Sequence, residues 1–250
     1  MGSEMCIRDS ARVVLISDRA AGPARAALPT LLAVGAVHQA LVRAGLRLRC
    51  GIVAETGEAR DVHQLACLIG YGATAVYPWL AYEILRDLHA GGKVDPKVDL
   101  AKACENYRKA AGKGLLKIMS KMGISTLLSY QGAQVFEALG VGDKVIDDCF
   151  SGTPSPIGGV GYEEIAGETL RRHARAWPSA GAAELGNEGW YLVNKKGEGE
   201  VHGWSPKVVA GMGKFLKSGG DAAGWAEWKT ASEEHAPVTI KDLLRIRFAA

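Results

Sequence analysis

The stretch Cys50–Ala81, CGIVAETGEARDVHQLACLIGYGATAVYPWLA, contains both of the hydrophobic periodicities of an α/β fold. Residues 48–54 form a short apolar run, which predicts a buried strand that ends in the acidic turn Glu55-Thr56-Gly57-Glu58. Residues 59–69 carry apolar side chains at helical spacing, and residues 73–79 predict the next strand. Strand, helix and strand at this short spacing indicate parallel strands joined by a right-handed helical crossover.

The sequence on either side continues this alternation. Residues 13–16 (VVLI) predict a parallel strand with the polar exit Ser17-Asp18-Arg19, and residues 31–46 predict a helix that ends at Gly45. Toward the C-terminus we expect helices at 80–88, 98–111, 114–122, 133–139 and 162–177, and a fourth strand at 124–128.

Three details of these C-terminal elements can be tested. Gly112-Lys113-Gly114 is expected to separate two helices, and the helix at 162–177 is expected to turn Ile165, Leu170 and Trp177 inward. Composition changes after Trp177, and residues 178–250 are expected to form a mixed extension of short helices and loops. Within it we expect a strand at 191–193 and a helix at 239–248 that Thr239 caps.

The length permits more structure than the pattern supplies. The chain has 250 residues, and a complete βα barrel typically needs about 250 residues and eight strands. Its 48% hydrophobic content is sufficient for a buried core, which excludes a disordered chain. With about four parallel strands, the pattern accounts for roughly half of a barrel.

Composition also excludes several classes of function. The formal net charge is +3 without a concentrated basic face, so we expect no nucleic-acid partner. No stretch is apolar for long enough to cross a membrane. The five cysteines are scattered without a CxxC pair and the six histidines show no ligand spacing, so we expect no metal site and no disulfide framework. Reduced thiols suit a cytoplasmic location.

The N-terminal residues differ in character from the rest of the chain. MGSEMCIRDS has no apolar periodicity, and it lacks the apolar region of a secretory signal. We therefore expect residues 1–11 to be a non-native or unrelated leader, with the fold beginning near Arg12.

Glu55, Glu58 and Arg60 form the first candidate site. They follow a strand, and the sites of βα barrels lie at the C-terminal ends of strands, which favours a ligand or domain-contact site. The alternative is ordinary helix capping, with Thr56 as the N-cap, Glu58 in the first turn and Arg60 paired to a carboxylate.

Two other stretches are weaker candidates. Lys113, Lys117 and Lys121 form one helical stripe, which is either an anion-binding surface or, by default, a solvated basic face. Residues 158–161 (GGVG) precede a helix, but their spacing is neither GxGxxG nor GxxxxGKS. A tight turn therefore explains this loop better than a phosphate cradle.

Long segments of the chain resemble one family. VVLISDR, the residues from ALPTLLAVGAVHQALVRAG through CGIVAETGEARDVHQLACLIGYGATAVYPWLAYE, and KGLLKIMSKMGISTLLSYQGAQVFEALGVGDKVIDDCFSGTPSPIGGVGYEEIA resemble the central domain of the glutamate synthase large (or ferredoxin-dependent) chain. The resemblance runs from about residue 12 to residue 177 and continues loosely to residue 248. It implies a partial, degenerate (β/α) barrel-like domain of the aldolase type over residues 12–177, with residues 178–250 leading toward the next domain.

The resemblance also implies a function. The parent enzyme would transfer glutamine-derived ammonia to 2-oxoglutarate and reduce the product to glutamate, using FMN, an iron–sulfur cluster and either ferredoxin or a nicotinamide nucleotide. This segment would be a structural link between the glutaminase domain and the FMN-binding barrel, without activity alone, in the cytoplasm or a plastid stroma. No catalytic, cofactor-binding or metal-binding residue of the family carries over to this sequence.

Two alternatives stay open at this level. The chain could be a self-contained phosphate- or flavin-binding βα enzyme that uses the Glu55–Arg60 turn and the lysine stripe. It could also be an interaction module whose exposed apolar faces need other domains.

Overall fold

A computed structural model describes residues 12–179, 181, 201–233, 238 and 240–244. The chain divides into two compact units, Met1–Ala183 and Glu184–Ala250. The expected leader at 1–11, the expected strand at 191–193 and the expected cap Thr239 lie outside the described residues.

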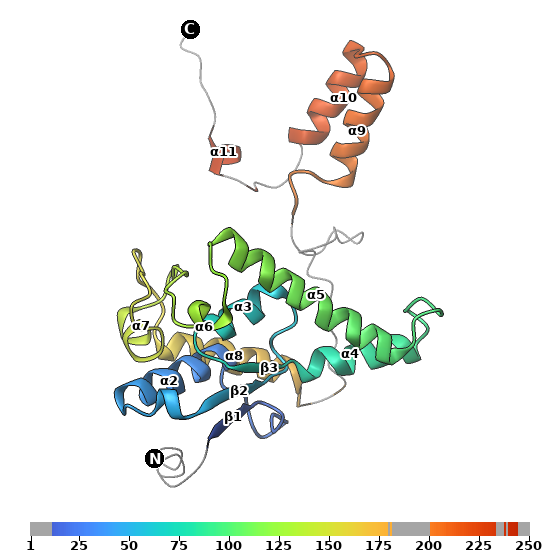
Figure 1. The fold of residues 1–250 in the computed structure, drawn as a ribbon. Helices are drawn as coiled ribbons and strands as arrows, with labels where there is room; N and C mark the ends of the chain where they lie inside the picture. Colours follow the sequence, from blue (N-terminus) through green and yellow to red (C-terminus); the bar gives the residue numbers. More distant parts are fainter. Residues whose placement is uncertain (1–11, 180, 182–200, 234–237, 239, 245–250) are drawn as a thin grey trace. The chain divides into compact units, whose positions relative to one another are not determined.

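The first unit is built on a three-stranded parallel sheet (Figure 1). Its strands are β1 (Val13–Ser17), β2 (Gly51–Glu55) and β3 (Ala75–Tyr77), in the order β1-β2-β3. Helix α2 (Thr30–Arg43) and the short 3-10 helix η1 (Arg47–Arg49) connect β1 to β2, and α3 (Val62–Gly70) connects β2 to β3. The predicted α/β alternation around residues 50–81 is thus confirmed.

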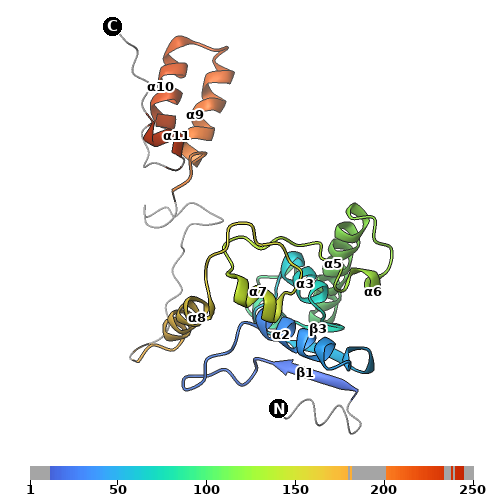
Figure 2. The same ribbon diagram turned by 90° about the vertical axis from the view of Figure 1, so that its left-hand side faces the viewer.

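Helices α2 and α3 cover one face of the sheet. Ile52 and Ala54 of β2 point into this layer and are 0% exposed. Ala54 packs with Val34 of α2 and with Leu65 and Leu68 of α3, whereas Ile52 packs in a second cluster with Leu41 of α2 and Leu46. Figure 2 shows α2 and α3 on the same side of β1.

The helices α4 (Trp79–Ala90) and α5 (Leu100–Lys121) follow the sheet. The expected break in α5 at Gly112-Lys113-Gly114 is wrong, because α5 runs through it as one helix. A Cβ at Gly114 would lie 2.5 Å from a side-chain carbon of Val62, so this glycine lets α5 approach α3 closely. The glycine serves helix packing rather than helix termination.

The remaining helices of this unit are α6 (Leu127–Tyr130), α7 (Asp143–Cys149) and α8 (Tyr162–Ala176). The fourth strand expected at 124–128 is wrong. Thr126 is the N-cap of α6, and its Oγ1 accepts a hydrogen bond from the Ser129 amide at 3.3 Å. Thr126, a β-branched residue inside the expected strand, therefore acts as a helix cap.

Two further expectations are corrected. Residues 133–139 are not helical, because the Ala138 amide donates to the Pro154 carbonyl at 2.8 Å and Phe136 stacks on Tyr71. The expected inward face of α8 is not formed, because none of its residues is buried: Ile165 is half-buried, Leu170 is 58% exposed, and Trp177 at the C-cap is also exposed. Tertiary contacts override the local pattern at residues 133–139.

The second unit contains α9 (Pro206–Lys217), α10 (Ala222–Glu233) and the short α11 (Ile240–Leu243). Ser205 caps α9 by accepting from the Val208 amide, and Pro206 is its first residue, where proline is tolerated. Phe215, Trp225 and Trp228 pack as a ring cluster between α9 and α10. Within the described part of the chain, none of the helices is long and apolar enough to cross a membrane.

Candidate functional site

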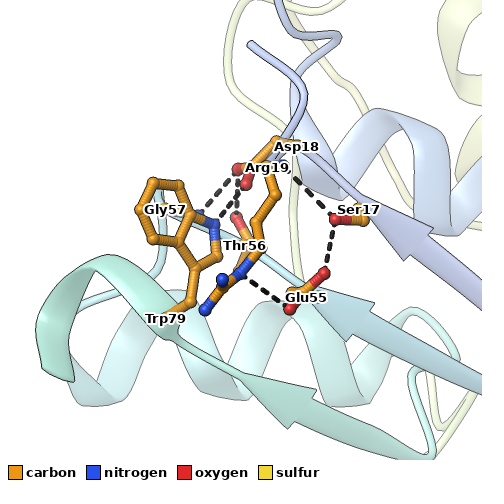
Figure 3. Close-up of polar contacts among 7 residues, drawn as sticks. All are labelled: Ser17, Asp18, Arg19, Glu55, Thr56, Gly57 and Trp79. Carbon is orange, nitrogen blue, oxygen red and sulfur yellow. Dashed lines mark hydrogen bonds and ion pairs between the residues drawn. The ribbon is translucent and has the colours of Figure 1, made fainter. Parts of the chain in front are cut away.

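Asp18 ties the C-terminal ends of all three strands together (Figure 3). It follows β1, and its Oδ2 accepts hydrogen bonds from the Gly57 amide at 2.7 Å and from Thr56 Oγ1 at 3.0 Å, both just beyond β2. Its Oδ1 accepts from Trp79 Nε1 at 2.6 Å, just beyond β3. Hydrogen bonds to a carboxylate are stronger than those between neutral groups, so Asp18 holds the three strand ends together.

Thr56, which donates one of these hydrogen bonds, is fully buried. Its one hydroxyl proton goes to Asp18, so its oxygen accepts from the Thr30 hydroxyl at 2.8 Å and from the Glu58 amide at 3.0 Å. The Glu58 carboxylate in turn accepts from the Thr30 amide at 2.6 Å. Because Pro29 supplies no side-chain cap, Glu58 satisfies the first amide of α2 from a neighbouring loop.

Glu55 belongs to a second, more exposed group on the opposite face of the sheet. One carboxylate oxygen accepts from Ser17 Oγ at 2.6 Å, and the other pairs with Arg19 Nε at 2.9 Å. The Arg19 guanidinium also lies 5.2 Å from the ring centre of Trp79 and 5.9 Å from that of Tyr77. Such distances allow a cation–π contact, and the pair leaves no unbalanced charge here.

A small cavity of about 180 Å³ opens between the end of β1 and the start of α2. Its apolar walls are five alanines with Ile16 and Leu28, and its polar lining residues are Ser17, Asp18, Arg25 and Thr30. Metabolite pockets are usually larger, about 300–1,000 Å³. Both oxygens of Asp18 are engaged within the protein, so the cavity has no carboxylate free for chemistry.

The structure separates the three residues predicted from the acidic turn. Glu55 and Glu58 have different partners, and the side chain of Arg60 joins neither group. Among the described residues Arg60 forms no ion pair; its amide donates to Gln64 Oε1 and its carbonyl accepts from Tyr107. The capping alternative is wrong in detail, because α3 begins at Val62 and its N-cap is Asp61.

The two weaker candidates have structural explanations. Lys113, Lys117 and Lys121 are exposed on α5, whose other side buries Met119 against α3 and Tyr130. In the glycine loop, a Cβ on Gly159 would lie 2.3 Å from the Gly140 carbonyl oxygen. The chain needs this glycine for a close backbone contact rather than for a phosphate.

Cys67 and His38 are a thiol and an imidazole whose pKa values are shifted by their surroundings. Cys67 Sγ lies 3.6 Å from His63 Nε2, but burial and the nearby Asp61 carboxylate raise the pKa of Cys67 to about 11. A nucleophilic thiol requires the opposite shift. Burial, with a further contribution from Arg47, lowers the pKa of His38, whose Nδ1 accepts from Arg47 Nε at 2.9 Å.

A metal centre has no ligand set in the described part of the chain, where no three His, Cys, Asp or Glu side chains gather closely enough to hold an ion. The cysteines described there are free thiols: Cys50, Cys67, Cys104 and Cys149.

Comparison with protein families decides the relationship. The family model of the glutamate synthase central domain matches residues 2–142. The chain belongs to the glutamate synthase central-domain family. It is 38% identical over 256 residues to the chloroplastic ferredoxin-dependent glutamate synthase 2 of Arabidopsis thaliana, covering 98% of this chain and 16% of that protein.

Other glutamate synthases are similarly related. The chain is 41% identical over 209 residues to the NADPH glutamate synthase large chain of Bacillus subtilis, covering 83% of this chain and 13% of that one. It is 38% identical over 250 residues to the NADH glutamate synthase of Schizosaccharomyces pombe, covering 98% of this chain and 12% of that one. The chain therefore spans between 12% and 16% of the length of these glutamate synthases.

Sequence reasoning missed the residues that organise this glutamate synthase segment. Asp18 and Trp79 were assigned only to a polar exit and a strand end. A signal was nevertheless present, because the C-terminal ends of neighbouring parallel strands share one sheet edge. An acidic residue directly after β1 could therefore have been expected to accept hydrogen bonds from residues that follow β2 and β3.

Proposed function

We propose that this chain is a structural, non-catalytic region of a glutamate synthase large chain. The parent activity is transfer of glutamine-derived ammonia to 2-oxoglutarate, with reduction of the product to glutamate. The region links and positions the glutaminase and FMN-binding domains of the same polypeptide. The observation that carries the proposal is identity of 38% over 98% of the chain to an enzyme of that name.

The polar groups at the sheet end support a structural role. The Asp18, Thr56 and Glu58 side chains are engaged by hydrogen bonds from the protein's own donors, and Glu55 is paired with Arg19. A general acid or base must instead be within reach of a reacting group. Their arrangement stabilises the strand ends and the start of α2.

The relatives also indicate that this region does not select the electron donor. Proteins named for ferredoxin, NADH and NADPH match it at 38%, 38% and 41% identity. A region that read the donor would be expected to favour one of these classes. The proposed partners of the chain are therefore the other domains of its synthase.

The cofactors of the parent do not fit the residues described here. Four separate free thiols provide no compact ligand set for an iron–sulfur cluster. The glycine loop at 158–161 is closed against Gly140, so it provides no cradle for the FMN phosphate. We assign FMN and the cluster to other domains of the parent.

The barrel resemblance and the compartment complete the proposal. The parallel β1-β2-β3 unit with α2 and α3 on one face is compatible with a piece of a degenerate (β/α) barrel. Chloroplastic relatives favour a plastid stroma for a plant chain, and the cytoplasm is proposed otherwise.

Purified chain tests the proposal directly. We expect neither glutaminase nor glutamate synthase turnover, and no flavin absorbance after dialysis against FMN-free buffer. Saturable FMN binding that Arg60→Ala abolishes would instead establish the self-contained enzyme. The matched control is Arg86→Ala, because Arg86 is an exposed arginine of α4 away from the acidic turn.

A further inference from the structure

The parallel sheet buries one face and leaves the other open. Strand register places Leu15, Val53 and Ala75 in one row across the sheet, with Val13 and Gly51 in the row before it. Val13 and Leu15 are each 60% exposed, whereas Ile52 on the other face is fully buried. The alternation along β1 is therefore apolar on both faces but covered on only one.

Such exposure is unusual for this type of sheet. Parallel sheets occur almost only with both faces covered, and their strands are correspondingly apolar throughout. Adjacent exposed aliphatic side chains rimmed by polar groups are typical of an interaction surface. The sequence of β1, VVLIS, has the composition of a strand covered on both sides.

The C-terminal rim of the open face has the chemistry of a binding surface. The last row of the sheet is Ser17, Glu55 and Tyr77, and Tyr77 is 44% exposed. Arg19 is paired with Glu55 and lies beside the Trp79 ring (Figure 3). Its guanidinium also lies near the Tyr77 ring. Arginine and aromatic side chains fixed in this way are the usual energetic centres of protein interfaces.

We infer that the face formed by Val13, Leu15, Val53, Ala75 and Tyr77 is the docking surface for an apolar segment of the same glutamate synthase polypeptide outside these 250 residues. This inference rests on the proposed function. The matched glutamate synthases contain this region as only 12% to 16% of their length, so ample chain exists to cover it. The five residues of the face are uncharged and the Glu55 carboxylate at its rim is paired with Arg19, which favours an aliphatic partner over nucleic acid or a lipid headgroup.

A chimeric large chain tests this inference, because it supplies the rest of the polypeptide that we expect to cover the face. The segment of the Bacillus subtilis large chain that matches this sequence is replaced by residues 12–250, and hydroxyl-radical footprinting compares Leu15 and Tyr77 in the chimera and in the isolated chain. We expect their labelling to fall by about fivefold or more in the chimera, as for side chains buried in an interface core. Leu48 is the internal control, because it is fully exposed on the short helix η1 and not on the open face, so its labelling should not change.

The outcomes separate the inference from the proposed function. Unchanged labelling of Leu15 and Tyr77 in a chimera that makes glutamate overturns the docking surface and leaves the proposed function standing. Protection in an inactive chimera supports the surface and counts against the function. Protection that appears in the isolated chain as its concentration rises overturns the inference in favour of a second copy.

A substitution gives a second readout that does not need the chimera to fold. Leu15→Asp should shift the melting temperature of the isolated chain by no more than about 2 °C, because surface changes alter stability little. In the chimera the same change should abolish the protection of Tyr77, whereas Leu48→Asp should leave it intact. Unfolding of the isolated chain by Leu15→Asp would show that this face is already covered, and would overturn the inference.

Discussion

The two faces of the β1-β2-β3 sheet have similar sequences and different environments. On one face Ile52 and Ala54 are fully buried under α2 and α3, and on the other Val13 and Leu15 are 60% exposed. Hydrophobicity alone does not distinguish the faces, because β1 is apolar on both. The difference teaches that this region contains one complete layer of core and one open apolar surface, which we propose is covered by another part of the same polypeptide.

The largest expected effect is the contrast between one substitution on each face. Ile52→Ala should lower the free energy of unfolding by about 4 kcal/mol, because it leaves a cavity in a packed layer. Leu15→Ala should change it by about 0.5 kcal/mol or less, as expected for a surface position. Urea denaturation of the isolated chain measures both, and equal losses would contradict the distinction between the faces.

Removal of the Asp18 carboxylate at the end of the sheet should have the next largest effect on stability. Asp18→Ala removes the acceptor for the Gly57 amide, the Thr56 hydroxyl and Trp79 Nε1, and should cost about 2 kcal/mol of stability. Trp79 fluorescence should change in parallel. Asp87→Ala on exposed α4 is the matched control, and an equally small loss at both positions would show that Asp18 holds nothing together.

A buried hydroxyl on the covered side predicts a gain. Tyr130 is fully buried and its hydroxyl has no hydrogen-bond partner among the described residues. Tyr130→Phe should therefore raise the free energy of unfolding by up to about 1 kcal/mol, since it removes an unsatisfied polar group. Tyr107→Phe is the control and should lose stability, because the Tyr107 hydroxyl donates to the Arg60 carbonyl.

The smallest effect is a pH dependence on the covered side. Burial and Arg47 lower the pKa of His38 in the folded protein below its ordinary value of 6.5. The unfolded chain therefore binds the proton more readily, so the contribution of neutral His38 is complete above pH 6.5 and is lost as the pH falls through the lowered pKa. Urea midpoints at successive pH values should show this loss in the native sequence.

His38→Gln removes the titrating group and keeps an acceptor for Arg47, so it should flatten this part of the pH profile. His63 on α3 provides the comparison, and His63→Gln should retain the slope. A profile that is unchanged by His38→Gln would assign the dependence to other groups.

The sequence predicted the elements whose local pattern agrees with their packing. Strands β1, β2 and β3 and their crossover helices follow from short apolar runs and from helical spacing in residues 13–81. The strand expected at 124–128 is wrong because Thr126, a β-branched residue within it, suits a helix N-cap as well as a strand. Gly114 was misread because a glycine that permits close helix packing resembles one that ends a helix.

The candidate site was predicted only in its location. The acidic turn after β2 does lie at the sheet end, but the organising residue is Asp18 and the residue pairing with Glu55 is Arg19. Both partners come from a segment more than 30 residues away, so their meeting depends on strand order rather than on local spacing. The Glu58 cap on α2 is missed for the same reason.

Glutamate formation by the chimeric large chain tests the central claim most directly. The claim is that residues 12–250 position the neighbouring domains of a glutamate synthase and contribute no group to its chemistry. We predict turnover within about threefold of the parental enzyme, unchanged by Arg60→Ala, because a group outside the chemistry adds little to the barrier. A correctly folded chimera whose turnover is lost on Arg60→Ala would contradict the account.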